Sequence, residues 1–383
     1  MKMNTENKIK VLHIYRTYFP DPPGGLQEAI KQICLSVAPL GVESKVFTLS
    51  PDPNPRSIQL EEGEVLREKS IINIASCDIG GVRSFQKFRE LVEWCDIVQL
   101  HFPWPFADLL NFMIPKDKPT LMTYHSDVVR QKFLGKLYNP LMNRTLRSMD
   151  CIVATSQNYV DSSPVLSREE FRSKTKVAPL CLKDRVITVG SSGRNEVLAK
   201  YGLEEGNYIL ALGVLRYYKG FHTLIEAAKY LNTTVVIAGS GPESESLKFQ
   251  FEKLKLNNVV FTGQVEEDEK HVLIQNSILL TLPSHLRSEA FGVVLIEALM
   301  HSKPLVTCDI GTGTSFVNKH QETGLVVEPG NPKALALAIN SIVSDTDILR
   351  EYQSSARKRY ENFFSSQAVS QQYMNIYHSI LKT

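Results

Sequence analysis

The stretch that decides the fold runs from residue 282 to residue 327 and reads LPSHLRSEAFGVVLIEALMHSKPLVTCDIGTGTSFVNKHQETGLVV. Residues 293–300 are apolar at helical spacing except for Glu297, so a helix is predicted to begin near Phe291 and Gly292, after a strand and a loop. Such a helix points its free N–H groups and the positive end of its dipole out of the carboxyl edge of the sheet. Because α/β proteins bind phosphates at that edge, the stretch predicts an α/β unit with an anion site.

Two carboxylates frame the predicted start of this helix. Glu289 precedes it and Glu297 lies eight residues later, which at the helical rise is roughly 12 Å. A nucleotide-sugar has a similar reach from its sugar hydroxyls to its ribose hydroxyls, so each carboxylate could hold one hydroxyl pair with the diphosphate between them. Taken alone, the spacing also fits a capping acid and a solvated glutamate, because so short a pattern is common by chance.

Other motifs accompany the two carboxylates, namely Pro283-Ser284, Phe291-Gly292, Lys303-Pro304 and ETGLVV at 322–327. The combination resembles the signature of the family 4 retaining glycosyltransferases. GVLRYYKG at 213–220 and DIGTGTSFVN at 309–318 are similar to bacterial mannosyltransferases that build O-antigen or capsular polysaccharide. The resemblance covers nearly the whole chain and implies the GT-B architecture, in which two Rossmann-like, doubly wound α/β domains face each other across a cleft.

Length and composition agree with two domains. A chain of 383 residues is too long for one ordinary core, and its 43% hydrophobic and 22% charged residues are typical of a soluble globular protein. The net charge of +2 gives no argument for nucleic-acid binding. No apolar run is long enough to span a bilayer, and the opening residues MKMNTENKIK lack the apolar core of a signal peptide. Six cysteines without close pairs predict buried free thiols in a reducing cytosol.

Predicted strands alternate with helices through the first half of the chain, at 10–15, 44–49, 71–75, 96–100, 120–124, 151–154 and 186–189. This alternation predicts parallel βαβ units. We expect a first, acceptor-side domain at 1–190 and a second, nucleotide-sugar-binding domain at 191–362. The resemblance implies that a C-terminal helix at 363–383 returns to the first domain.

Three features of the first domain lie at the ends of predicted strands. Gly24 and Gly25 precede a helix predicted from about residue 27 to 39, where they either let backbone N–H groups approach a ligand or form a tight turn. The aromatic stretch HFPWPF at 101–106 could stack on a sugar or pack the loop. His125 ends a predicted strand, where a lone histidine is more often structural. The resemblance implies that Gly24 and Gly25 lie near the diphosphate and that His125 contacts the donor sugar.

Residues 128–149 differ in character from the rest of this domain, because they contain five basic residues and no acid among many apolar ones: Arg130, Lys132, Lys136, Arg144 and Arg147. A basic amphipathic segment predicts a surface that can lie on anionic lipid. A helix whose apolar face packs on the domain and whose basic face is solvated is the alternative.

Two cations follow the strand predicted at 208–212. Arg216 and Lys219 lie between a glycine and a helix, an arrangement that predicts a phosphate contact rather than an ordinary solvated loop. The resembling family usually has arginine directly after the glycine, whereas this chain has Val214 there. Lys219 matches the family, and whether Arg216 replaces the missing arginine is left open.

The segment GQVEEDEK at 263–270 corresponds to the loop that holds the base in the resembling family. Members that use guanosine nucleotides have an acid two residues and a lysine five residues after the valine, and these places are Glu267 and Lys270 after Val265. A carboxylate can accept from guanine N1–H and N2–H together, whereas uracil offers a single N–H. This comparison favours GDP, although an acidic helix start explains the segment nearly as well.

These features predict a retaining glycosyltransferase that moves an α-linked hexose, expected to be mannose from GDP-mannose, onto a lipid-linked oligosaccharide in O-antigen or capsule synthesis. The residues expected at the chemistry are Glu289, His125, Lys219 and Arg216. Those expected to bind the nucleotide-sugar are Gly24, Gly25, Arg216, Lys219, Val265, Glu267, Lys270, Glu289, Ala290, Phe291, Gly292, Val293 and Glu297. No metal or cofactor is expected, because the Asp-x-Asp at Asp345 and Asp347 lies far from these motifs. No side chain stands out as a nucleophile, which fits the same-face displacement that the resemblance implies.

Rival functions remain at this point. A UDP-sugar-dependent transferase of the same family and a GT-B-like nucleotide-sugar epimerase would use the same architecture, and a nucleotide-sensing scaffold would use it without catalysis. A Rossmann dehydrogenase is disfavoured because the chain lacks GxGxxG at its first turn. We expect a cytoplasmic protein that contacts the inner face of the cytoplasmic membrane peripherally through 128–149.

Overall fold

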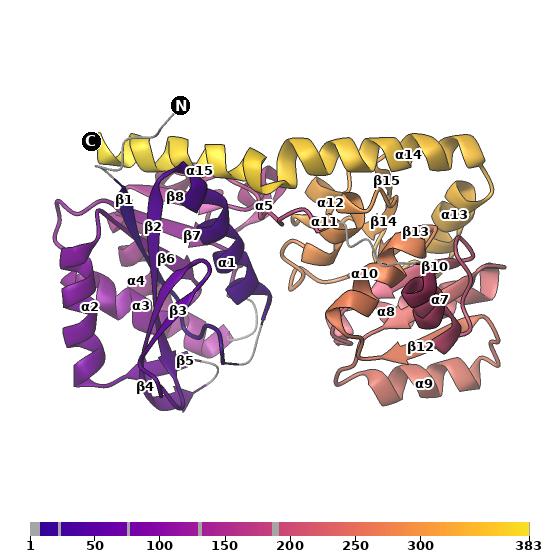
Figure 1. Cartoon of the computed structure of the whole chain (residues 1–383), viewed down its shortest axis with the longest axis horizontal. Helices are drawn as coiled ribbons and strands as arrows, with labels where there is room; N and C mark the ends of the chain where they lie inside the picture. The colour runs from indigo at the N-terminus through magenta and orange to yellow at the C-terminus, as the bar shows by residue number, and fades with distance from the viewer. Residues whose placement is uncertain (1–7, 22–23, 75–76, 129–131, 186–190, 383) are drawn as a thin grey trace. The chain divides into compact units, whose positions relative to one another are not determined.

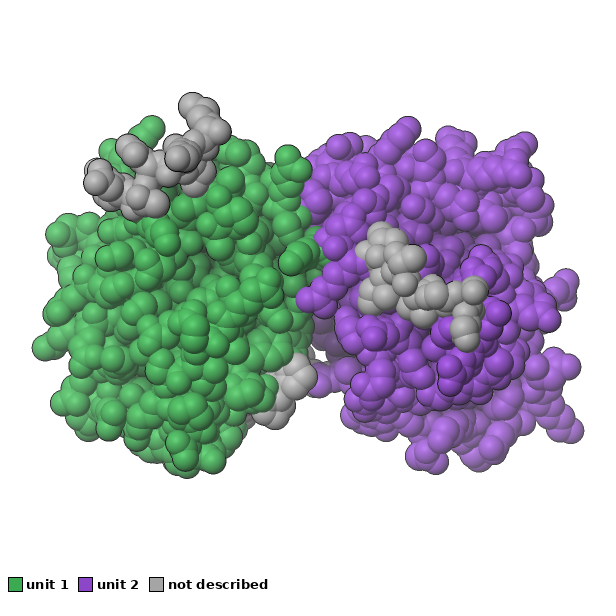
Figure 2. All heavy atoms as spheres, in the orientation of Figure 1, with its two compact units in different colours: residues 1–183, 366–383 green, residues 184–365 purple. Residues whose placement is uncertain are grey.

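A computed structural model of the chain describes residues 8–21, 24–74, 77–128, 132–185 and 191–382. The chain divides into two compact units, which Figure 2 colours separately. Unit 1 comprises Met1–Lys183 and Ser366–Thr383, and unit 2 comprises Asp184–Ser365. Each unit contains its own largely parallel sheet with helices packed on it, so the α/β class predicted from the sequence is confirmed.

The sheet of unit 1 has nine strands, with neighbours in the order β3-β4-β2-β1-β6-β7-β8-β9 and β5 beside β4. These are β1 (Ile9–Ile14), β2 (Val42–Ser50), β3 (Ser57–Leu60), β4 (Gly63–Ile74), β5 (Cys77–Gly80), β6 (Ile97–Phe102), β7 (Thr120–Tyr124), β8 (Cys151–Ala154) and β9 (Thr175–Val177). β3 and β5 pair antiparallel with β4, while β1 pairs in parallel with β2 and β6. β6, β7 and β8 are buried along their whole length, as expected of strands that helices cover on both faces.

The helices of unit 1 come from both ends of the chain (Figure 1). They are α1 (Gly25–Val37), α2 (Val82–Trp94), α3 (Pro105–Leu110), α4 (Lys132–Ser148), α5 (Gln157–Ser162), α6 (Glu169–Arg172) and α15 (Ser366–Leu381). α15 lies against α1, and its Val369, Tyr373 and Tyr377 share a core cluster with Val11 and Leu121. The last helix therefore completes the core of the first unit.

The sheet of unit 2 has the order β12-β11-β10-β13-β14-β15. Its strands are β10 (Tyr208–Leu212), β11 (Thr234–Ala238), β12 (Val259–Gly263), β13 (Leu279–Leu282), β14 (Leu305–Cys308) and β15 (Gly324–Val327). Its α-helices are α7 (Ser191–Lys200), α8 (Phe221–Ala227), α9 (Ser244–Lys253), α10 (Glu267–Asn276), α11 (Val293–Met300), α12 (Thr314–Val317), α13 (Pro332–Val343) and α14 (Thr346–Arg359).

Both sheets contain a point where the strand order reverses. In unit 1, β1 lies between β2 and β6, and in unit 2, β10 lies between β11 and β13. Connections from two adjacent strands leave in opposite directions there, and ligands of open α/β sheets bind at the carboxyl ends of such a strand pair. The topology therefore predicts ligand binding at the ends of β1 and β6 and at the ends of β10 and β13.

Several element boundaries differ from the sequence prediction. The strand predicted at 71–75 is the end of the longer β4, which begins at Gly63, and the antiparallel β3 and β5 were missed. The helix predicted at 27–39 begins at Gly25 and ends at Val37. The strand predicted at 186–189 lies outside the described residues. Within the described part of the chain, no helix is long and apolar enough to cross a bilayer.

All six cysteines are free, as predicted, and five of them are buried. Cys77, which begins β5, is half-buried.

Candidate active site

The carboxyl edge of unit 2 brings Lys219 and Glu289 together where its strand order reverses. Lys219 follows β10 on the short helical turn η3 (Tyr217–Lys219), and Glu289 follows β13. The Lys219 Nζ lies 2.7 Å from Glu289 Oε2, and both side chains are nearly buried, at 12% and 11% exposed. Ser284 Oγ lies 3.4 Å from the same carboxylate oxygen as a donor. Two residues that the sequence selected separately thus form one ion pair.

The absence of a side chain at Gly213 leaves space for the Lys219 side chain. Its φ of +140° lies in the region that favours glycine, and a Cβ at this position would lie 3.3 Å from Lys219 Nζ. The next residue, Val214, has an exposed side chain, as does Arg216 at the start of η3. Of the two cations predicted here, Lys219 is therefore the one that reaches Glu289.

The loop between Glu289 and α11 is held by the glycine-rich segment that follows β14. Thr312 Oγ1 donates to the Glu289 carbonyl at 2.8 Å, and the Gly313 N–H donates to the Ala290 carbonyl at 2.8 Å. A Cβ at Gly313 would lie 2.3 Å from the Phe291 ring. No chemistry was predicted for this segment from the sequence, and in the structure it holds the carboxylate loop in place.

The helix predicted from the opening stretch is confirmed. α11 runs from Val293 to Met300, and Gly292 caps its N-terminus with φ +81°, a left-handed conformation. Ala290, Phe291, Gly292 and Val293 therefore form the loop and first turn of this helix, whose unpaired N–H groups carry the positive end of the dipole.

A second carboxylate–lysine pair lies on α10 and α11. Lys270 Nζ lies 2.6 Å from Glu297 Oε1 and 2.7 Å from Glu267 Oε1. Burial alone would lower the pKa of Lys270, but Glu297 and Glu267 more than offset burial and raise it. Hydrogen bonds from His271 and Lys270 lower the pKa of Glu267 to about 2. The three side chains therefore form one charged network.

The acidic start of α10 also has a local structural explanation. Glu266 and Glu269 form a reciprocal capping box, and the first turn is rich in acids that favour the positive end of the dipole. Val265 is half-buried just before this helix, and the Glu267 side chain is 59% exposed. The helix start accounts for Glu266 and Glu269, while Glu267 remains accessible from solvent.

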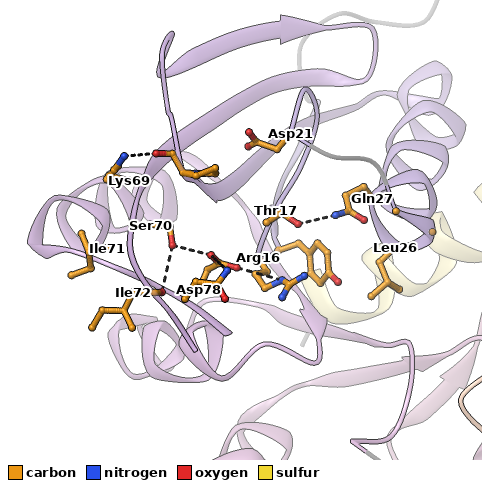
Figure 3. A pocket seen from close by; sticks show the side chains of 15 residues that line it. Arg16, Thr17, Asp21, Leu26, Gln27, Lys69, Ser70, Ile71, Ile72 and Asp78 are labelled. Carbon is orange, nitrogen blue, oxygen red and sulfur yellow. Dashed lines mark hydrogen bonds and ion pairs between the residues drawn. The ribbon is translucent and has the colours of Figure 1, made fainter. Parts of the chain in front are cut away.

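In unit 1, Gly24 and Gly25 border a pocket of about 780 Å³ (Figure 3). Gly24 is the N-cap of α1, where a Cβ would lie 2.6 Å from Gln27 Oε1, and Gly25 is the first residue of that helix. A Cβ at Gly25 would meet nothing within 4 Å. The remaining lining comes from the end of β1, from β4 and from β5, and includes Arg16, Thr17, Asp21, Lys69, Ser70, Ile71, Ile72 and Asn73.

Asp78 is the buried carboxylate of this pocket. It is 5% exposed, and its Oδ1 accepts from Ser70 Oγ at 2.8 Å and from Asn73 Nδ2 at 3.0 Å. Arg16 Nε lies 3.6 Å from its Oδ2, which has no hydrogen-bond partner among the described residues. Figure 3 shows Asp78 and Arg16 between Ile71 and Ile72 on β4 and Gln27 on α1. The pocket therefore offers a carboxylate oxygen, amide groups and a hydroxyl beside apolar surface.

His125 follows β7 in unit 1 and is 3% exposed. Its Nε2 lies 3.0 Å from Nδ1 of His101, and burial lowers the pKa of His125 to about 3. The sequence treated this residue as a lone histidine, whereas the fold gives it a histidine neighbour from β6. Its imidazole is therefore neutral near neutral pH.

Of the two alternatives for the aromatic stretch at 101–106, the structure supports packing of the loop. His101 is fully buried, and Phe102, Trp104 and Phe106 are each 1% exposed. The predicted helix within 128–149 exists as α4, but residues 129–131 and the side chains of 132–137, including Lys132 and Lys136, lie outside the description.

In the described half of α4, apolar residues pack on the unit and basic residues face solvent. Met142 and Leu146 are buried, Arg147 pairs with Glu170 at 2.8 Å, and the Arg144 guanidinium lies 4.1 Å from the Phe112 ring centroid.

Two doubly wound units, each with polar side chains gathered at the carboxyl edge of its sheet, define the GT-B class of protein. The solved structures support this class. Sucrose-phosphate synthase from Thermosynechococcus elongatus superposes with a TM-score of 0.77 at 20% identity, over 98% of this chain and 100% of that one. The Anabaena protein HepE in complex with UDP superposes with a TM-score of 0.76 at 19% identity, over 97% and 100%. The predicted GT-B fold is therefore confirmed.

Sequence comparison then identifies the family. A model described as Glycosyltransferase Family 4 matches residues 23–162, and one described as Glycosyl transferases group 1 matches residues 193–359. O-antigen chain mannosyltransferase C of Escherichia coli is 38% identical over 376 residues, covering 98% of this chain and 100% of the relative. The D-rhamnosyltransferase WbpZ of Pseudomonas aeruginosa is 41% identical over 359 residues, covering 94% and 93%. The chain belongs to the family 4 glycosyltransferases.

Proposed function

We propose that the protein is a retaining transferase that moves an α-linked hexose from a GDP-sugar onto a lipid-linked glycan during O-antigen synthesis. The names of the two relatives support mannose or D-rhamnose as the sugar and O-antigen as the product. D-rhamnose is mannose without the hydroxyl at carbon 6, so either sugar would need the same hydrogen bonds to the remaining ring hydroxyls. The observation that carries the proposal is the pair of carboxylate–lysine contacts, Glu289 with Lys219 and Glu297 with Lys270.

In the proposed donor complex, Glu289 accepts hydrogen bonds from the sugar hydroxyls and Glu297 accepts them from the ribose. Lys219, with Arg216, meets the charge that develops on the departing diphosphate, together with the N–H groups at the start of α11. The Lys219 ammonium is already held at the edge of the sheet by Glu289, so little reorganisation is needed for it to meet the phosphate. No metal ion takes part in the proposed transfer.

The bond changes of the proposed transfer balance without a protein nucleophile. The bond between the anomeric carbon and the diphosphate oxygen breaks, and the acceptor oxygen forms a new bond to the same face of that carbon. The proton of the acceptor hydroxyl passes to the departing phosphate oxygen. His125 contacts the donor sugar in this arrangement.

Glu267 is proposed to read the base. Its carboxylate can accept from guanine N1–H and N2–H together, and its side chain is exposed enough to be reached. Lys270 pairs with both Glu267 and Glu297. It would therefore fix the carboxylate that contacts the base relative to the carboxylate that contacts the ribose. This arrangement supports GDP over UDP as the nucleotide.

The pocket of unit 1 is proposed to bind the sugar at the end of the acceptor glycan. The Oδ2 of Asp78, which lies 3.6 Å from Arg16 Nε and has no hydrogen-bond partner among the described residues, is the proposed acceptor for a sugar hydroxyl, while Asn73, Thr17 and Gln27 supply neutral polar groups. Ile71 and Ile72 offer apolar surface of the kind that packs on the C–H face of a sugar ring.

The decisive experiment incubates the full chain with one nucleotide-sugar at a time and a lipid-linked acceptor. GDP-mannose, GDP-D-rhamnose, UDP-glucose and UDP-N-acetylglucosamine form the panel, and product is detected by mass spectrometry. We expect acceptor-dependent transfer from a GDP-sugar with retention of the α configuration. Transfer only from a UDP-sugar would contradict the nucleotide assignment. Conversion of the donor without acceptor would indicate an epimerase, and binding without either reaction would indicate a scaffold.

Peripheral contact with an anionic membrane is a further part of the proposal. Phe112, which follows α3, is 50% exposed and has the Arg144 guanidinium of α4 over its ring, and Leu109 of α3 is 44% exposed, so exposed apolar side chains occur near the basic helix. Neutralising Arg130, Lys132 and Lys136 together should reduce sedimentation with vesicles that contain phosphatidylglycerol. Neutralising Lys229, Lys248 and Lys253 in unit 2 is the matched control and should leave sedimentation unchanged. Equal sedimentation of both triple variants would contradict the membrane contact.

A further inference from the structure

His125 is the last of three hydrogen-bonded histidines at three adjacent strands of unit 1. His13 lies on β1, His101 on β6 and His125 directly after β7. His13 Nδ1 lies 3.1 Å from His101 Nε2, and His101 Nδ1 lies 3.0 Å from His125 Nε2. Their rings stack with centroids 5.4 and 5.3 Å apart and are nearly parallel, at 22° and 20°. His13 and His101 are fully buried.

The three imidazoles are neutral, because burial lowers the pKa of His13 and of His125 to about 3 and lowers that of His101 as well. A neutral imidazole has one nitrogen that donates and one that accepts. When His13 Nδ1 donates to His101, His101 Nδ1 must donate to His125, and the proton of His125 then lies on Nδ1. In the reverse arrangement every tautomer is exchanged, and His125 Nδ1 becomes an acceptor. The hydrogen-bonded chain therefore has two states, and His125 cannot change tautomer independently.

The chain has an unpaired polar atom at each end. Within the described residues, His13 Nε2 and His125 Nδ1 are buried without a hydrogen-bond partner. Thr155, which follows β8 as His125 follows β7, has a buried and unpartnered Oγ1 as well. A buried polar atom without a partner is costly, and such atoms need an explanation in a folded protein. A ligand hydroxyl placed against His125 Nδ1 and Thr155 Oγ1 would supply the partner.

Packing alone does not require these histidines. On the same face of the sheet, the layer below is already tied by hydrogen bonds, from Tyr377 to Gln99 at 2.7 Å and from Gln99 to Thr123 at 2.8 Å. The layer below that is apolar and contains Val11, Ile97 and Leu121. Apolar side chains in place of His13 and His101 would continue that core without unpaired atoms.

We propose that His101 and His13 are positioning residues for His125: they hold its ring and tie its tautomer to their own, so that the three histidines together take one of the two states and Nδ1 presents the matching hydrogen-bonding character to a sugar hydroxyl. The proposal rests on the proposed function only in that the hydroxyl belongs to the donor sugar. His125 alone contacts substrate, and the other two act through it.

A matched pair of substitutions at His101 tests the proposal, because two amides imitate different ring nitrogens. In His101→Asn the amide lies where Nδ1 was and can still bond His125, whereas in His101→Gln it reaches the position of Nε2 and bonds His13. Both variants lose one of the two hydrogen bonds, so their melting temperatures should fall together. Val46→Ala truncates a buried side chain of the same unit that is not one of the three histidines, and it controls for general loss of stability.

Two measurements are made on the full chain labelled with nitrogen-15 histidine. Ring nitrogen shifts report the tautomer of each histidine, and steady-state kinetics report kcat and donor KM. In the wild type we expect His125 as a single neutral tautomer, retained in His101→Asn and mixed in His101→Gln. We expect kcat to fall about tenfold further in His101→Gln than in His101→Asn, with donor KM changed less than kcat, because a small misplacement of a group beside the reacting atoms mainly affects the chemical step.

The outcomes separate this proposal from the proposed function. If no donor is transferred, the nitrogen shifts alone decide: loss of the single His125 tautomer in His101→Gln but not in His101→Asn supports the chain. Unchanged His125 shifts in both variants overturn it. Where transfer is observed, a second result also overturns the proposal. In this result His101→Asn and His101→Gln have equal kcat, and the loss of kcat follows the loss of melting temperature in both, as it does in Val46→Ala.

Discussion

The carboxyl edges of the two sheets have the same topology but different side chains at their centre. Where β10 and β13 meet, the side chains are charged and joined in pairs, as in Lys219 with Glu289. Where β1 and β6 meet, the central side chains are the neutral imidazoles of His13 and His101. The strand order thus determines where a ligand can bind, and the residues at the strand ends determine what it can be.

The difference fits two kinds of ligand. A diphosphate needs cations held near its oxygens, and an ion pair of low exposure keeps a lysine at that place without a free charge in the apolar interior. Sugar hydroxyls need donors and acceptors of modest strength, which neutral imidazoles provide, as do the amides near Asp78 in the pocket of unit 1. The comparison can be tested by removing charges at one edge and hydrogen-bonding groups at the other.

The largest effect is expected from Glu289→Gln. The amide keeps the shape of the side chain but loses the charge that holds Lys219 and accepts sugar hydroxyls, so transfer should fall about a hundredfold or more. Initial rates with saturating acceptor measure the loss, and circular dichroism checks the fold. Glu245→Gln, at an exposed glutamate on α9, is the control and should keep its rate. Turnover of Glu289→Gln within a factor of about two of the wild type would remove Glu289 from the chemistry.

Lys219→Met should come next in size. The variant keeps much of the side-chain volume but loses the charge, so the affinity for GDP should fall by about tenfold to a hundredfold, as expected for one charge-assisted hydrogen bond. Titration calorimetry with GDP measures it, with Lys248→Met on α9 as the exposed control. A Kd that matches the control would place the diphosphate elsewhere.

A smaller effect is expected at the pocket of unit 1. Asp78→Asn replaces a carboxylate oxygen with an amide that accepts more weakly, so the KM for the acceptor should rise about tenfold while donor affinity is unchanged. Asp161→Asn, at an exposed aspartate of the same unit, is the matched control. A rise in donor KM with constant acceptor KM would show that the pocket does not bind the glycan.

The smallest effect concerns acid stability. Unfolded histidines bind protons below a pKa of about 6.5, whereas His13 and His125 in the fold do so only near 3, so the free energy of unfolding should fall as pH drops from about 7 to about 5. Asp108 acts in the opposite direction, because burial raises its pKa to about 7 and the folded state binds its proton first.

Comparison with His101→Asn isolates one histidine from these opposing groups. His101 also titrates well below its usual pKa in the fold, so the wild type should lose about 5 °C more of its melting temperature than the variant over this interval. Differential scanning calorimetry at the two pH values measures the difference. Equal losses in both proteins would show that His101 is not held neutral by burial.

Most of the fold could be predicted because buried parallel strands appear in the sequence as short apolar runs. The start of α11 was predicted from the glycine at 292 and the apolar spacing after it, and both follow from local physics. β3 and β5 were missed because their residues are partly exposed and too few to show a period, and because antiparallel additions to a parallel sheet depend on pairing with β4.

The candidate site was predicted in part for the same reason. Lys219 and Glu289 could each be selected from their place after a strand, but their contact spans seventy residues and is set by the order of β10 and β13. His13 is a single histidine inside an apolar strand and was not selected, and His101 was noted only as part of the aromatic stretch at 101–106. Asp78 likewise could not be selected from the sequence, because it joins the pocket only when β5 pairs with β4 and lies beside the end of β1.

The position of α15 has a consequence for synthesis on the ribosome. Val11, Ile97 and Leu121 emerge early but share their core cluster with residues of α15, which are translated after the whole of unit 2. Unit 2 is continuous in sequence and can fold as soon as it emerges, whereas the larger part of unit 1 must wait with an uncovered apolar face. During synthesis, unit 1 therefore has the greater need of a chaperone, and this need lasts until α15 has been made.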